Sequence, residues 1–132
     1  MVHKVVIIED DPETADMLAE MMRLSGYLVV KAPDGFRALA TIAERSPAVV
    51  LLDVMLPEFS GLDILKNMRR DPRLACIPVV IVSAKCLPAD VQVGLDAGAT
   101  CYLTKPVSLE EVVRAVGDAI QASTHRVQEQ RQ

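Results

Sequence analysis

The chain has 132 residues, enough for one domain with a sizeable core. Hydrophobic residues make up 51% of it and charged residues 24%, a balance typical of a globular protein that argues against general disorder. The net charge of −4 and the aromatic content of 3% argue against nonspecific nucleic-acid binding, which requires basic residues for phosphates and aromatic rings for bases.

The cysteines are Cys76, Cys86 and Cys101, an odd number with no CxxC pair. This pattern favours neither a disulfide framework nor a zinc site. The first residues hold no apolar segment long enough for a signal peptide or a membrane span, because the run at residues 5–8 has only the length of a strand. We therefore expect a cytoplasmic protein without a membrane segment.

The first buried strand is predicted at residues 5–8, where it leads into Glu9-Asp10-Asp11. Asp11 is placed to cap a helix, and Pro12 suits its first turn. This helix ends at Gly26, and its apolar face consists of Ala15, Leu18, Ala19 and Met22. A short strand at 28–30 follows, and then a second helix that Asp34-Gly35 opens and Pro47 ends.

Residues 49–52 are four consecutive apolar residues, a pattern typical of a strand buried on both faces. This run delivers one carboxylate, Asp53, which must lie at the rim of the sheet because burial without a partner would be costly. Pro57 cannot donate to a ladder and ends the strand region. Ser60 is the predicted N-cap of the third helix, which runs to Asp71-Pro72 and turns Gly61, Ile64, Leu65 and Met68 inward.

A fourth strand is predicted at residues 77–82, before Ser83-Ala84-Lys85. A weaker helix at 88–97, with Val91 and Leu95 inward, precedes a last strand at 99–103 and Thr104-Lys105-Pro106. Ser108 and Glu111 form a capping box for the final helix, whose apolar stripe is Leu109, Val112, Val113, Val116 and Ile120. We expect the domain to span residues 1–123 and the polar residues 124–132 to form a frayed tail.

Alternation of buried strands with amphipathic helices predicts an α/β fold, a parallel sheet with helices on both faces. Ligands of such sheets bind beyond the carboxyl ends of the strands. Four of the predicted strand ends carry groups suited to chemistry: Glu9 with Asp10, then Asp53, Ser83 and Lys105.

Three carboxylates at one edge repel one another and favour a hard divalent cation with oxygen ligands, hence Mg²⁺. Lys105 adds a second positive charge, and the set contains no histidine. Such a set suits phosphoryl transfer, in which cations neutralise phosphoryl oxygens and a carboxylate can act as the nucleophile that becomes an acyl phosphate.

With these residues in place, the sequence resembles the receiver domains of two-component response regulators. The matching segments are VVIIEDD at residues 5–11, LLDVMLPEFSG at 51–61, VSAK at 82–85 and YLTKP at 102–106. The resemblance covers the chain to about residue 123 and implies a flavodoxin-like, doubly wound (βα)5 fold with strand order 2-1-3-4-5. Alternation alone does not imply this order.

The resemblance also implies a role for each site residue. Asp53 would accept the phosphoryl group. Mg²⁺ would be held by Asp10, Asp53 and the backbone carbonyl of Met55, with Glu9 acting mainly through water. The phosphoryl group would be bound by Lys105, Ser83 and the backbone of Ala84, and Tyr102 would change rotamer with Ser83. The bond from Lys105 to Pro106 would be cis, an isomer that a proline can adopt at low cost.

The implied function is a phosphorylation switch. A histidine kinase or phosphotransfer protein would donate the phosphoryl group, and the chain would catalyse only its own phosphorylation and slow autodephosphorylation. The surface of the fourth helix, fifth strand and fifth helix would then control an unknown output partner. Thr100 and Cys101 stand where receivers of many DNA-binding regulators carry an acidic pair used in a charged dimer interface, so we do not expect that form of dimer. We expect a monomer or a phosphorylation-dependent dimer, with no direct nucleic-acid binding by this chain.

Three other functions compete with this one. A phosphorylation-independent interaction module on the same fold would leave the clustered acids and Lys105 without a reason. A haloacid-dehalogenase-type phosphohydrolase needs a proton-transferring Asp two residues after its nucleophile, where this chain has Met55. A flavin-binding electron carrier needs a phosphate-binding loop after the first strand, where Glu9-Asp10-Asp11 would repel phosphate.

Overall fold

The computed structural model describes residues 2–32 and 34–130, with side chains described as far as Ser123. Within these residues five strands alternate with five helices along the chain. The elements are β1 (Lys4–Ile8), α1 (Pro12–Leu24), β2 (Leu28–Ala32), α2 (Gly35–Arg45), β3 (Val49–Leu52), α3 (Gly61–Arg70), β4 (Val79–Ser83), α4 (Pro88–Asp96), β5 (Cys101–Thr104) and α5 (Leu109–Gln130).

All neighbouring strands of the sheet are parallel, in the order β2-β1-β3-β4-β5. The predicted order 2-1-3-4-5 and the doubly wound fold are therefore confirmed. The register pairs Ile8 of β1 with Leu52 of β3. Because these residues end their strands, the next residues, Glu9 and Asp53, emerge side by side at the carboxyl edge.

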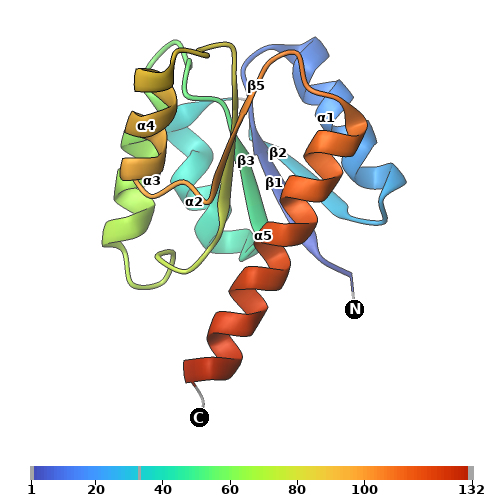
Figure 1. Cartoon of the computed structure of the whole chain (residues 1–132), viewed down its shortest axis with the longest axis vertical. Coiled ribbons are helices and arrows are strands. Elements are labelled where there is room, and N and C mark those ends of the chain that lie inside the picture. Colours follow the sequence, from blue (N-terminus) through green and yellow to red (C-terminus); the bar gives the residue numbers. More distant parts are fainter. Residues whose placement is uncertain (1, 33, 131–132) are drawn as a thin grey trace.

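Helices cover both faces of the sheet, with α1 and α5 on one side and α2, α3 and α4 on the other (Figure 1). The side chains of β1 alternate between the two cores, as strand geometry requires. Val5 and Ile7 pack with residues of α1 and α5, whereas Val6 and Ile8 pack with residues of α2 and α3. The predicted inner faces of α1 and α3 are buried as expected.

The fourth helix packs differently from its prediction. The prediction turned Leu95 inward, but this side chain is 40% exposed, and the one buried residue of α4 is Gly94. The helix approaches the sheet through this glycine, because a Cβ there would lie 2.7 Å from the Tyr102 ring. Leu109 of α5 was also predicted inward and is exposed, while Val112 and Val116 are fully buried.

Several predicted boundaries also shift. The fourth strand begins at Val79 rather than at residue 77, because Pro78 has no N–H and the Ile77 N–H closes a turn onto the Leu74 carbonyl. The last strand begins at Cys101, since Ala99 bonds back to Gly94. Residues 124–130 continue α5 where a frayed tail was expected, and residues 131–132 lie outside the described part.

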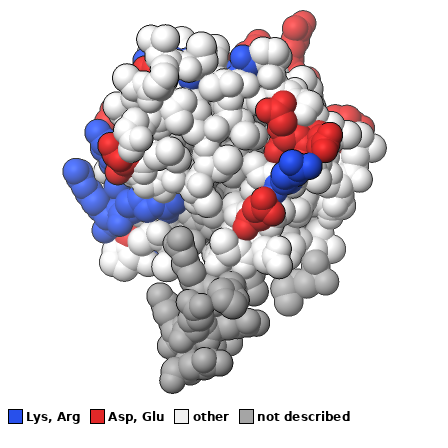
Figure 2. Space-filling view, viewed as in Figure 1, with Lys and Arg blue, Asp and Glu red and all other residues white. Residues whose placement is uncertain are grey.

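The middle of the face formed by α4, β5 and α5 is largely uncharged. Figure 2 shows white atoms between the two helices, with acidic and basic groups on either side. On α5, Glu110 and Arg114 form an exposed ion pair. Exposed apolar side chains on these helices include Val93, Leu95 and Leu109. Within the described residues, no helix is both long and apolar enough to cross a membrane.

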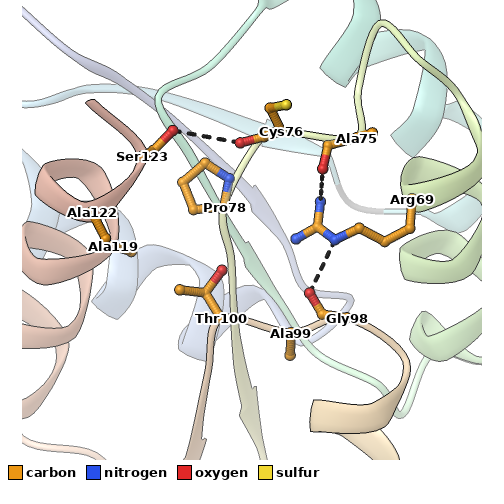
Figure 3. Close-up of a pocket in the computed structure, with 10 residues that line it drawn as sticks. All are labelled: Arg69, Ala75, Cys76, Pro78, Gly98, Ala99, Thr100, Ala119, Ala122 and Ser123. Carbon is orange, nitrogen blue, oxygen red and sulfur yellow. Dashed lines mark hydrogen bonds between the residues drawn. The ribbon is translucent and has the colours of Figure 1, made fainter. Parts of the chain in front are cut away.

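A cavity of about 350 Å³ lies at the amino-terminal edge of the sheet, opposite the edge that carries Glu9 and Asp53. It lies between the last turn of α3 and α5 (Figure 3). Arg69 lines it and donates hydrogen bonds to the carbonyls of Gly98 at 3.0 Å, Ala75 at 3.2 Å and Ile77 at 2.7 Å. One guanidinium group thus joins α3, the segment before β4 and the turn before β5, and its role there is structural.

Replacing Arg69 with Ala should lower the free energy of unfolding by about 2–4 kcal/mol, because half-buried carbonyls would lose a charged donor. The adjacent Arg70→Ala change is the control, since Arg70 is exposed, and it should change the value by less than about 0.5 kcal/mol. Urea unfolding followed by circular dichroism measures both. Equal effects of the two substitutions would contradict the role given to Arg69.

Candidate functional site

Three carboxylates meet at the carboxyl edge of the sheet. Glu9, Asp10 and Asp53 each place an oxygen within 4.8 Å of the others. Glu9 and Asp53 are buried, with 3% and 6% exposure, while Asp10 is exposed. Their convergence follows from the parallel register of β1 and β3, which ends both strands at the same level.

Lys105, which follows β5, bridges the two buried carboxylates. Its Nζ lies 2.6 Å from Glu9 Oε1 and 3.0 Å from Asp53 Oδ2. The other Asp53 oxygen, Oδ1, accepts a hydrogen bond from the Met55 N–H at 2.9 Å. Within the described residues, every buried side-chain nitrogen and oxygen has a hydrogen-bond partner, so burial leaves none of these polar atoms unsatisfied.

Burial and the neighbouring charged groups shift the proton equilibria of the site. Burial raises the pKa of Glu9 to about 7, and the neighbouring Asp53 adds to this shift, although the hydrogen bond from Lys105 opposes it. Burial also acts to lower the pKa of Lys105, but its hydrogen bonds to Glu9 and Asp53 outweigh that effect and raise it. Near neutral pH, therefore, Glu9 exchanges a proton while Lys105 keeps its charge.

The loop after Asp53 turns back tightly on itself. The Gly61 N–H donates to the Val54 carbonyl at 2.9 Å, and the backbones of Met55 and Ser60 form an isolated bridge. A side chain at Gly61 would place its Cβ 2.4 Å from the Asp53 carbonyl oxygen, so the loop depends on a glycine there. Ser60 then caps α3 as predicted, and its hydroxyl accepts from the Leu62 N–H.

The other predicted site residues lie on or after β4 and β5: Ser83 ends β4 and Ala84 follows it, Tyr102 lies within β5, and Pro106 follows Lys105 after that strand. Ser83 is fully buried, and its hydroxyl accepts from the Lys85 N–H at 3.2 Å. Ala84, next to it, is exposed. The Tyr102 hydroxyl donates to the Lys85 carbonyl at 2.8 Å, and burial raises the pKa of this tyrosine. The bond between Lys105 and Pro106 is cis.

The donor set fits a divalent cation. Glu9, Asp10 and Asp53 together carry three negative charges when ionised, against one positive charge on Lys105, so a divalent cation would balance the remaining excess. Carboxylate oxygens are the ligands that Mg²⁺ prefers. A groove of about 620 Å³, which Asp10, Met55, Phe59 and Lys85 help to line, gives access from solvent beside these oxygens.

One lining residue was not anticipated from the sequence. Phe59 stands at the rim of this groove, and its ring packs against the beginning of α2. The available signal was a large apolar residue in a loop, with no helical or strand periodicity to indicate what it contacts. Glu9, Asp10, Asp53, Ser83 and Lys105 were predicted because each one ends a strand or follows one. Met55, Ala84, Tyr102 and Pro106 were predicted from the family resemblance.

The sequence matches the response regulator receiver domain family over residues 5–117. The chain belongs to this family. Among curated relatives, it is 43% identical over 110 residues to the probable transcriptional regulatory protein TcrX of Mycobacterium tuberculosis, covering 83% of this chain and 46% of TcrX. It is 37% identical over 113 residues to the DNA-binding regulator RpaA of Synechocystis, covering 86% of this chain and 47% of RpaA. The receiver domain thus spans about half the length of these relatives.

Solved receiver structures have the same architecture. A response regulator from Chloroflexus aurantiacus superposes with a TM-score of 0.88 at 31% identity, over 92% of this chain and 99% of that one. The receiver domain of the sensor kinase PA1611 from Pseudomonas aeruginosa gives a TM-score of 0.84 at 26% identity, over 92% and 99% of the two chains. That structure holds a magnesium ion in its active-site cleft.

The raised pKa of Glu9 predicts a pH-dependent stability in metal-free solution. The folded protein holds this proton more tightly than the unfolded chain, so stability is fully present below pH 4.5 and is lost as the pH rises through about 7. Relative to Glu9→Gln, the unfolding free energy of the wild type should fall by about 1–3 kcal/mol between about pH 5 and about pH 8.

Urea unfolding in EDTA at several pH values measures this slope, and any constant offset from the lost ion pair cancels. Glu58→Gln, in the exposed part of the loop, is the matched control and should keep the wild-type slope. Saturating Mg²⁺ should flatten the wild-type slope, because metal binding requires the ionised carboxylate. A difference between wild type and Glu9→Gln that stays constant with pH would contradict the titration of Glu9.

Proposed function

We propose that Asp53 accepts a phosphoryl group from the phosphohistidine of a histidine kinase or phosphotransfer protein. The observation that carries this proposal is the contact of Lys105 Nζ with both Asp53 and Glu9, beside an acidic cluster that opens onto a groove. In the transfer, an Asp53 carboxylate oxygen attacks phosphorus, the nitrogen–phosphorus bond breaks, and the imidazole nitrogen keeps the electron pair and takes a proton. The products are an acyl phosphate on Asp53 and a neutral histidine.

The site residues divide the work of this transfer. Glu9, Asp10, Asp53 and the Met55 carbonyl would hold Mg²⁺, which when bound neutralises negative charge on the phosphoryl oxygens. Lys105 already lies 3.0 Å from Asp53 and is placed to contact a phosphoryl oxygen on that carboxylate. The Ser83 hydroxyl and the Ala84 N–H complete the set of donors.

Phosphorylation would change the surface of α4, β5 and α5. The hydrogen bond between the Tyr102 hydroxyl and the Lys85 carbonyl ties β5 to the segment after Ser83, so a movement of Ser83 toward the phosphoryl group would be felt by Tyr102. The output partner would bind this face, which is uncharged in its middle and charged along α5 (Figure 2). Because Thr100 and Cys101 replace an acidic pair in this region, the charged dimer of many DNA-binding relatives is not expected here.

Two other functions can be distinguished from this proposal. A phosphohydrolase would need a proton donor at Met55, whose thioether cannot transfer protons. An interaction module that functions without phosphorylation would keep the fold but gain no phosphoryl group. In the proposed function, by contrast, the chain would catalyse only its own phosphorylation and slow autodephosphorylation.

Intact mass after incubation with acetyl phosphate tests the proposal. The wild type should gain one phosphoryl group with Mg²⁺ and none in EDTA, and Asp53→Ala should gain none under either condition. Asp63→Ala is the matched control, since Asp63 is an exposed acid in the first turn of α3, and it should react like the wild type. No gain by the wild type under any condition would favour the interaction module.

The apolar side chain of Met55 leads us to predict a long-lived acyl phosphate on Asp53. Its side chain is 49% exposed at the groove beside Asp53 and offers no hydrogen-bonding group to orient an attacking water. A Met55→Asn protein should lose the phosphoryl group several-fold faster, because an amide can orient that water. The decay of the phosphorylated mass after removal of acetyl phosphate measures this, and an unchanged rate would contradict it.

A further inference from the structure

The ring of Phe59 joins the loop after Asp53 to the second helix. It packs edge-to-face on Phe36 in the first turn of α2, with ring centroids 4.7 Å apart and an interplanar angle of 65°. It also lies over Gly35, where a Cβ would come within 2.4 Å of Phe59 Cδ2 and 3.1 Å of Phe59 Cε2. The ring thus occupies the space that a side chain at Gly35 would need.

The contact surface on α2 is fixed by the rest of that helix. The Asp34 side chain accepts a hydrogen bond from the Arg37 N–H at 2.9 Å and caps the first turn. Ala38 and Ile42 are fully buried in the core against the sheet. Gly35 is therefore part of a rigid platform rather than a mobile end.

The loop that receives this contact is anchored near Asp53 by Val54 and Leu56, whose side chains are buried in the core. Met55, Glu58 and Phe59 are exposed, so burial alone does not hold them. On the α3 side, the loop is held by the bond from Gly61 to Val54 and by the bridge between Met55 and Ser60. Between these two parts, the exposed stretch before Ser60 has Phe59 as its contact with the first turn of α2.

We propose that Gly35 and Phe59 are positioning residues for the metal site. The notch at Gly35 seats the Phe59 ring, and the seated ring holds the loop in which Asp53 and the Met55 carbonyl are presented to Mg²⁺. Neither residue contacts the ion. This inference rests on the proposed function and adds α2, an element outside the acidic cluster, to the parts that determine metal affinity.

The test is a double-mutant cycle on Mg²⁺ binding by the whole chain, followed through amide chemical shifts. Gly35→Ala displaces the ring and Phe59→Ala removes it, so each should raise the dissociation constant about tenfold, the lower end of the range for residues that support metal ligands. The double variant should match Phe59→Ala alone, because the added methyl group then has nothing to displace. Gly117→Ala is the control, since a Cβ at that helical glycine meets nothing within 4 Å, and it should bind like the wild type.

A second readout separates positioning from a general loss of stability. In both single variants, amide hydrogen exchange at Met55 should accelerate, since its N–H bonds to Asp53 within the loop, while exchange in β1 and β3 stays as in the wild type. Phe59→Leu, which keeps an apolar anchor, should restore most of the affinity. Should Gly35→Ala fail to fold, Phe59→Ala decides alone, because it introduces no clash.

The outcomes separate this inference from the proposed function. Wild-type binding of Mg²⁺ with unchanged dissociation constants in Phe59→Ala, or additive effects in the cycle, would overturn the positioning role and leave the phosphorylation switch intact. A wild type that neither binds Mg²⁺ nor reacts with acetyl phosphate would overturn the proposed function. In that case the hydrogen-exchange readout still tests the inference. An amide exchange rate at Met55 that is the same in the variants as in the wild type would also overturn the role of Phe59 in holding the loop.

Discussion

The constraint on which the site depends is the repulsion between two buried carboxylates at adjacent strand ends. Parallel pairing of β1 and β3 leaves Glu9 and Asp53 no freedom to separate, since their positions follow from the backbone register. Lys105 offsets the repulsion by contacting both, from a strand that is two positions away from β3 in the sheet. The strand order therefore shapes the electrostatics, because a residue after β5 needs a long side chain to reach both acids across the end of β4.

The same arrangement explains how a divalent cation could replace the proton on Glu9. In metal-free protein, Lys105 and a proton on Glu9 together compensate the buried acids. A bound divalent cation would replace the proton, and Lys105 would then be able to contact a phosphoryl group on Asp53. The buried charges are thus compensated in each state, which is the condition for keeping carboxylates out of water.

Much of the fold and of the site could be predicted from the sequence. Apolar runs locate the strands, and the carboxyl ends of parallel strands bring their polar residues to one edge of the sheet. Glu9, Asp53 and Lys105 were found in this way, whereas the strand order came from family resemblance, because alternation does not determine how strands pair. Leu95 was misplaced because α4 packs on the sheet through Gly94, and periodicity weighs side chains rather than close backbone contact. The contacts of Phe59 and Arg69 join segments distant in sequence, and no local pattern indicates them.

The burial of α4 bears on how a phosphorylation signal could leave the site. Helix α3 buries Gly61, Ile64, Leu65 and Met68, while α4 buries only Gly94 among the described residues. Because apolar burial contributes about 1.5–3 kcal/mol for each large side chain, displacing α4 costs far less than displacing α3. The ring of Tyr102 lies against Gly94 and its hydroxyl bonds to Lys85, so this tyrosine contacts both the weakly held helix and the loop beside the site. A switch requires an element whose two positions differ by only a few kcal/mol. In the proposed switch, α4 would be this element, because it has the fewest buried residues of the described helices.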